Sequence, residues 1–105
     1  MSQQLLMQEM SVSQILGTYG KKFIQIKEKY SDGLNGRCAI GVIMSYYGWD
    51  GKDKSDAARR CAFRALKSAG TDKDIVVQLN DSGAIFNEIA DYLDRIGTKQ
   101  ELTAT

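Results

Sequence analysis

Asn80, Asp81 and Gly83, followed by Glu88, are the residues of this chain whose types and spacing come nearest to a chemical site. Asn and Asp side chains accept backbone N–H groups in turns, and Gly adopts positive φ readily, so these residues predict a structural corner in front of a helix. The alternative is that Asp81, together with Glu88, contacts a ligand or a cation. A calcium loop would require several more oxygen ligands at fixed spacing. The residue types therefore favour the structural corner.

A run of cations forms the second candidate site. Its members are Arg59, Arg60, Arg64 and Lys67. Basic side chains contact the phosphates of nucleic acids, whereas bases stack on aromatic side chains, and Phe63 is the one aromatic residue within this run. We interpret the run as the solvated face of a helix. Contact with nucleic-acid phosphates is the alternative.

Three aromatic residues, Tyr46, Tyr47 and Trp49, form the third candidate. Large aromatic side chains with polar tips are common at protein interfaces, and they also close hydrophobic cores. Because each of them buries a large area, we favour closure of the core and keep an interface as the alternative.

Several common kinds of catalytic and metal site are disfavoured. The chain has no histidine, which is the commonest general base and metal ligand. Its two cysteines, Cys38 and Cys61, make no disulfide framework and are predicted to be small buried apolar residues. No P-loop, dinucleotide fingerprint or metalloprotease motif occurs. We expect no catalytic residue set, no metal and no cofactor.

The composition is that of one globular domain. The chain has 105 residues, of which 43% are hydrophobic and 26% charged, with a net charge of +1. These values exclude wholesale disorder and argue against a protein whose whole surface binds nucleic acid or membrane. The longest uncharged stretch, Cys38 to Trp49, has 12 residues and is too short to span a bilayer. No basic region precedes the first apolar residues, so we expect no signal peptide, no membrane partner and a cytoplasmic protein.

The first half of the chain predicts two helices. Ser11 and Gln14 have the spacing of a capping box, and apolar residues then recur at helical spacing as far as Tyr30. Turn-forming residues follow over 31–36. The segment 38–47 is apolar nearly all round, as in a central buried helix, with a buried strand as the alternative. It ends at Gly48.

The second half predicts two or three more helices. A small apolar stripe over 57–69 indicates a helix capped by Asp53 or Ser55 and followed by Gly70. The segment 71–79 fits either a short helix, capped by Thr71, or a strand, and we favour the helix. The last helix is expected over 84–96, with its end at Gly97.

These elements together predict a mainly α fold, a compact single-domain bundle of four to five helices. Residues 1–10 are expected to form an N-terminal arm or an extra turn, residues 11–97 the helical domain and residues 98–105 a frayed tail. The helix over 38–47 is expected at the centre, with the first, third and last helices packed around it.

Two segments resemble a set of small, uncharacterised phage and bacterial proteins. One is Cys38–Ile43 (C-A-I-G-V-I), and the other is Leu79–Asp91 (L-N-D-S-G-A-I-F-N-E-I-A-D). Those proteins carry a C-C-L-G-V-L-like segment followed by L-N-D-x-G-x-[ST]-F-x-E-I-A-D, and the likeness covers roughly residues 19–93 in order and spacing. It implies a shared ancestry and a mobile-element origin, but it implies no reaction.

The chain departs from this pattern at two positions. Arg37 stands where the first of the paired cysteines is usual, so a function of adjacent thiols is not implied. Ile85 stands where a Ser or Thr would form a capping box with Glu88. We therefore expect the last helix to start earlier, capped by Ser82 or Asp81.

The leading functional hypothesis is a non-enzymatic intracellular domain for interaction or regulation with a protein partner. The first alternative is nucleic-acid binding through the basic face that carries Arg59, Arg60, Arg64 and Lys67. The second is a small-molecule or enzymatic site near Asp81 and Glu88. Homo-oligomers are compatible with all three hypotheses.

Overall fold

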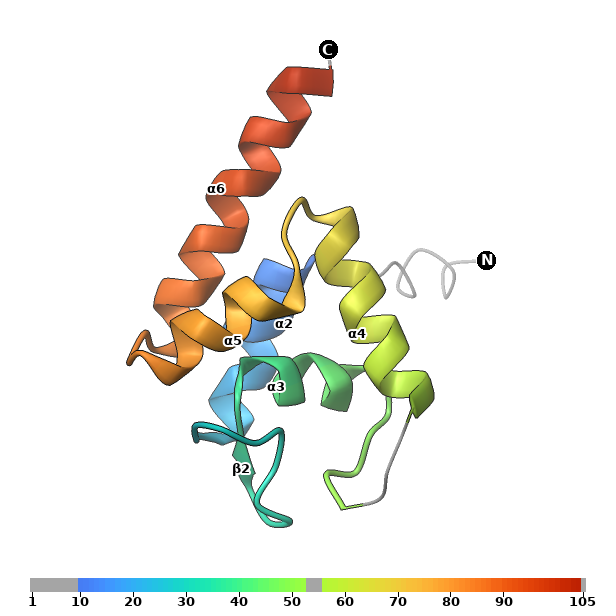
Figure 1. Cartoon of the computed structure of the whole chain (residues 1–105), viewed down its shortest axis with the longest axis vertical. Helices are drawn as coiled ribbons and strands as arrows, with labels where there is room; N and C mark the ends of the chain where they lie inside the picture. The colour runs from blue at the N-terminus through green and yellow to red at the C-terminus, as the bar shows by residue number, and fades with distance from the viewer. Residues whose placement is uncertain (1–9, 53–55, 105) are drawn as a thin grey trace.

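The computed structural model describes residues 10–52 and 56–104, without the side chains of 98–104. Its elements, in chain order, are α2 (Val12–Tyr19), the 3-10 helix η1 (Gly20–Lys22), β1 (Ile24–Gln25), β2 (Gly36–Arg37), α3 (Ala39–Tyr46), α4 (Asp56–Ser68), α5 (Lys73–Asp81) and α6 (Phe86–Ala104) (Figure 1). The predicted mainly α, single-domain bundle is confirmed. Most of residues 1–10 and the expected caps Asp53 and Ser55 lie outside the described residues.

Helix α3 is the centre of the core, as predicted for the segment 38–47. Every residue from Ala39 to Met44 is buried, because the segment offers an apolar side chain or glycine in every direction. Helices α2, α4 and α5 pack against α3, whereas α6 packs mainly on α2 and also on α5. In Figure 1, α6 runs past α5 and extends beyond the rest of the bundle. The last helix thus covers the core through α2.

The first helix begins as predicted but ends much earlier. The Ser11 hydroxyl accepts the N–H of Gln14 at 3.1 Å, and the Gln14 side chain accepts the N–H of Ser11 at 2.9 Å, so the capping box is confirmed. The predicted continuation to Tyr30 is wrong. Gly17 and Gly20 weaken the helix, and the β-branched residues after Phe23 favour an extended chain.

The segment after η1 forms a small sheet that the sequence analysis did not predict. Strand β1 pairs with β2 in parallel, with Ile24 opposite Gly36. The loop between them brings β2 directly in front of α3. The sheet therefore fixes the backbone that leads into the central helix.

Helix α4 follows its predicted pattern. Ala58, Ala62 and Leu66 are buried on one face. Gly70 follows the helix with φ of 95°, a left-handed conformation that favours glycine and ends a helix.

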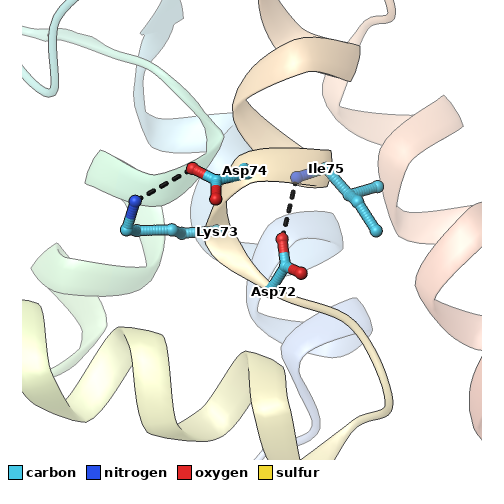
Figure 2. A network of polar contacts seen from close by, with 4 residues as sticks. All are labelled: Asp72, Lys73, Asp74 and Ile75. Carbon is cyan, nitrogen blue, oxygen red and sulfur yellow. Dashed lines mark hydrogen bonds and ion pairs between the residues drawn. The ribbon is translucent and has the colours of Figure 1, made fainter.

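The segment 71–79 was predicted as a helix or a strand, and helix α5 confirms the favoured helix. Its N-cap differs from the predicted one. Figure 2 shows Asp72 accepting the N–H of Ile75, at 3.1 Å, beside the surface ion pair of Lys73 and Asp74. Asp72 is therefore the N-cap, and the predicted capping by Thr71 is wrong. The Thr71 side chain is buried instead, and its hydroxyl contacts the hydroxyl of Tyr92 at 3.0 Å.

Helix α6 differs from its predicted bounds at both ends. It starts at Phe86, so the expected earlier start with a cap at Ser82 or Asp81 is wrong, since Asp81 and Ser82 end α5. The Glu88 carboxylate still accepts the N–H of Ile85 at 3.0 Å, which is one half of a capping box. The helix also continues through Gly97 as far as Ala104, because a single glycine weakens a helix by only about 1 kcal/mol.

Candidate functional site

Asn80 is buried at the end of α5 and joins three elements. Its Oδ1 accepts the N–H of Ala39 at 3.0 Å and the Nε2 of Gln25 at 2.8 Å, and its Nδ2 donates to the carbonyl of Ile26 at 2.8 Å. Only 1% of the residue is exposed. The amide therefore caps the start of α3 and holds the segment after β1 against α5.

Gln25 extends this contact to the start of α6. Its Nε2 also donates to the carbonyl of Ala84 at 2.7 Å, and its Oε1 accepts the N–H of Phe86 at 3.1 Å. The sequence analysis missed this residue. The available signal was one polar residue, Gln25, between two isoleucines. Because neighbouring side chains of a strand point to opposite faces, Gln25 lies on the face opposite to the two isoleucines.

Asp81, Gly83 and Glu88 also serve the backbone. Asp81 accepts the N–H of Glu28 at 3.0 Å, and Glu28 has a positive φ of 69°. Gly83 has φ of 112°, and the Glu88 carboxylate accepts a hydrogen bond from the N–H of Ile85. These contacts are those of a structural corner, and they lend no support to a ligand site shared by the two carboxylates.

Arg37 is a second buried polar centre. Only 4% of the residue is exposed. Its acceptors are the hydroxyls of Ser31 and Ser45 and the carbonyls of Leu34, Gly36 and Asp50, at distances of 2.8 to 3.3 Å. The rings of Phe23 and Trp49 flank the guanidinium, with centroids 4.6 and 5.7 Å from its central carbon. The sequence analysis treated Arg37 only as a departure from a family pattern, although a cation directly before an apolar helix was a signal.

Cys38 is the buried N-cap of α3. Its Sγ accepts the N–H of Gly41 at 3.5 Å, and burial raises the pKa of the thiol. Cys61, on α4, is only half-buried, so the prediction of full burial is wrong for this residue. Cys61 lies next to the row of cations on α4, at the edge of the buried stripe.

Among the described residues, one member of the basic run on α4 has an ion-pair partner and the other three have none. Arg59 pairs with Asp56 at 2.7 Å. Arg60, Arg64 and Lys67 are exposed and follow each other at helical spacing, opposite the face formed by Ala58, Ala62 and Leu66. The structure therefore brings these three cations into one row.

The aromatic cluster lies half-buried against the core. The ring of Tyr46 lies edge-on to Tyr19, at 5.4 Å between centroids, and to Tyr47, at 5.0 Å. The Tyr46 hydroxyl accepts the N–H of Met10 at 3.1 Å, and Trp49 lies beside Arg37. These contacts agree with closure of the core, the favoured interpretation.

A surface groove lies between η1 and the start of α6. Its volume is about 240 Å³, and its apolar lining comes from Leu16, Phe23, Ile85 and Phe86. The lining residue Ile85 is 55% exposed, and Ile24, between the lining residues Phe23 and Gln25 in the sequence, is 69% exposed. No sequence pattern indicated this groove.

No family model, curated protein or solved structure matches the chain. In residues 10–52 and 56–104, no helix is long and apolar enough to cross a membrane. Within the same ranges, no three Cys, Asp or Glu side chains are grouped so that they could hold a metal ion.

Proposed function

We propose that the chain is a non-enzymatic domain for interaction or regulation whose partner is a protein. The observation that carries this proposal is a set of large apolar side chains exposed on a fixed framework. Its members are Ile24, Leu34, Ile75 and Ile85, with exposed fractions of 69, 77, 41 and 55%. Exposed apolar groups gain free energy when a partner covers them. A cytoplasmic location and a mobile-element origin belong to the same proposal and rest on the sequence.

The loop that carries Leu34 supports the proposal because its backbone is held on both sides. The Asp32 carboxylate accepts the N–H of Leu34 at 2.8 Å, and the Arg37 guanidinium donates to the carbonyl of Leu34 at 2.9 Å. A side chain displayed on a fixed backbone loses little conformational freedom when it binds. Such a display suits an interaction surface.

Affinity purification from native lysate tests this function. The unmodified chain should recover a specific protein, and a variant with Ser in place of all four exposed apolar residues should lose it. The control variant carries Ser at four exposed polar positions, Lys27, Asn35, Gln78 and Asp91, and should keep the partner. Repeated recovery of nothing, alongside turnover of a small molecule by the chain, would reject the proposal.

Nucleic-acid binding is the second candidate, and the row of Arg60, Arg64 and Lys67 favours it. Three phosphate contacts predict an affinity whose logarithm falls with the logarithm of salt concentration at a slope of about −2.7. Arg60→Ala should reduce that slope by about 0.9. Lys29→Ala removes the same charge away from α4 and should leave the slope unchanged. Undetectable binding to duplex and single-stranded probes at low salt would dispose of this candidate.

A further inference from the structure

The groove between η1 and the start of α6 has a residue at its rim that local stability does not explain. The carbonyl of Ile85 accepts the N–H of Ile89 at 3.0 Å, which places Ile85 at the N-cap of α6. Isoleucine is among the poorest N-cap residues, whereas Ser or Thr would complete the capping box with Glu88. The Ile85 side chain is also 55% exposed, so burial within the chain does not offset the missing cap. A residue that breaks a local rule without a gain in the fold indicates a role in binding.

We propose that this groove binds one large apolar side chain from an acidic segment of a partner protein. This inference rests on the proposed interaction function and names where and what the domain binds.

The walls of the groove are fixed before any partner arrives. Both ends of the Gln25 amide are engaged, with the carbonyl of Ala84 and the N–H of Phe86. In addition, a Cβ on Gly20 would lie 2.9 Å from Cδ2 of Phe86, so the ring packs directly on the glycine backbone. A preformed site avoids the entropic cost of ordering its walls on binding.

The size of the groove selects a side chain over a free small molecule. Its volume of about 240 Å³ is below the range of about 300–1,000 Å³ that is usual for small-molecule sites. One Phe, Leu or Trp side chain matches this scale, and such anchors dominate the affinity of protein interfaces.

The charge around the groove selects an acidic partner. Lys21 is the one charged residue among those that line the groove in the described part of the chain, and the next residue is the exposed Lys22. The nearest acidic group on α6, the Glu88 carboxylate, is held by the N–H of Ile85. Acidic side chains next to an apolar anchor would therefore meet the positive charge of Lys21 and Lys22.

Selection of short random peptides on the purified full chain tests the proposal. The enriched peptides should share a large apolar residue flanked by Asp or Glu, with binding measured by fluorescence polarisation of the synthetic peptides. Ile85→Ser should weaken binding at least about tenfold, because it removes an apolar rim contact. The same variant should be more stable than the unmodified chain, since it completes the capping box, so misfolding cannot cause the loss.

Two variants control for hydrophobicity and charge. Ala57→Ser changes an exposed apolar residue on α4, which is not among the lining residues, and Arg64→Glu reverses a charge on the same helix. Both should bind within about twofold of the unmodified chain, whereas Lys21→Glu should bind at least about tenfold more weakly.

Four results would overturn the proposal. The enriched peptides could lack acidic residues, or bind Ile85→Ser and the unmodified chain alike. The chain could form a dimer that Ile85→Ser dissociates, which would assign the groove to a second copy. A lysate partner whose binding is insensitive to both Ile85→Ser and Lys21→Glu would leave the interaction function intact and remove the groove from it.

Discussion

Asn80 and Arg37 are the two most deeply buried polar residues in the described part of the chain, and they hold the backbone in different ways. Asn80 offers donors and an acceptor, and it connects β1, α3 and α5 through bonds in both directions. Arg37 offers donors alone, and it gathers carbonyl and hydroxyl oxygens from two loops and from α3. One centre joins elements through a neutral amide, and the other orders loops around a positive charge.

The difference between the two centres shows what a fold needs in order to bury a neutral amide and a charged guanidinium. Burial of an amide has little net cost when each of its groups has a partner, whereas the loss of solvation is much larger for a buried cation. Around Arg37 this loss is offset by five oxygen acceptors and by the faces of two aromatic rings. No buried side-chain nitrogen or oxygen among the described residues lacks a hydrogen-bond partner. Removal of either residue would leave several buried groups unsatisfied.

The largest effect is expected from Arg37→Ala. The substitution leaves buried oxygens without donors and opens space between Phe23 and Trp49, so the free energy of unfolding should fall by about 4 kcal/mol. Urea denaturation followed by circular dichroism measures this loss. Arg64→Ala, on the exposed face of α4, should change stability by less than about 0.5 kcal/mol. A loss below about 1 kcal/mol for Arg37→Ala would show that the centre contributes little.

Asn80→Ala is expected to have the next largest effect. It removes the acceptor of the Ala39 N–H and the donor to the Ile26 carbonyl, which should lower the free energy of unfolding by about 3 kcal/mol. Asn87→Ala, at an exposed position on α6, is the control and should cost less than about 0.5 kcal/mol. Equal stability of the two variants would contradict the role of Asn80 as a buried connector. A loss larger than that of Arg37→Ala would reverse the ranking of the two centres.

The same two centres mark how far sequence reasoning reached. The residue types and the turn pattern pointed to Asn80 as part of a corner, but its partners Gln25, Ile26 and Ala39 lie more than forty positions away, and local patterns carry no signal for such contacts. The capping box predicted the start of α2, and the apolar pattern predicted the burial of α3, because both features depend on neighbouring residues. The end of α2 at Tyr19 was missed, since it depends on pairing of β1 with β2 across a loop. Arg37 was missed for the same reason, because its burial depends on loops that fold around it.

Gly51→Ala crowds the Arg37 centre and leaves the Asn80 centre untouched. A Cβ on Gly51 would clash with Nη2 of Arg37, and the residue has φ of 85°. Gly48 has φ of 100° but open space around it, so Gly48→Ala measures the backbone strain alone. We expect losses of about 2–3 kcal/mol for Gly51→Ala and about 1 kcal/mol for Gly48→Ala, measured by thermal and urea unfolding. Equal losses would mean that Arg37 can move aside and that its site is less fixed than that of Asn80.

Asp32 provides the smallest effect and tests the loop that faces Arg37. Its carboxylate accepts the N–H groups of Leu34 and Gly36, and these bonds hold the pKa of Asp32 below its ordinary value of 3.8. A carboxyl group with a lower pKa in the folded chain binds protons more weakly there than in the unfolded chain. Its contribution to stability is therefore present above the ordinary pKa and is lost as the pH falls through the lower folded value.

Asp32→Asn should make the loss of stability below about pH 4 shallower than in the unmodified chain. The measurement is a series of urea denaturations between about pH 2 and pH 6. Asp74→Asn, at an exposed ion pair on α5, controls for the removal of any carboxylate. If both variants follow the same pH profile, the loop is held by the Arg37 guanidinium alone. If only Asp32→Asn flattens the dependence of stability on pH, the site of Arg37 depends on a loop whose backbone is held by the Asp32 carboxylate. The neutral centre at Asn80 has no such dependence on a charged group.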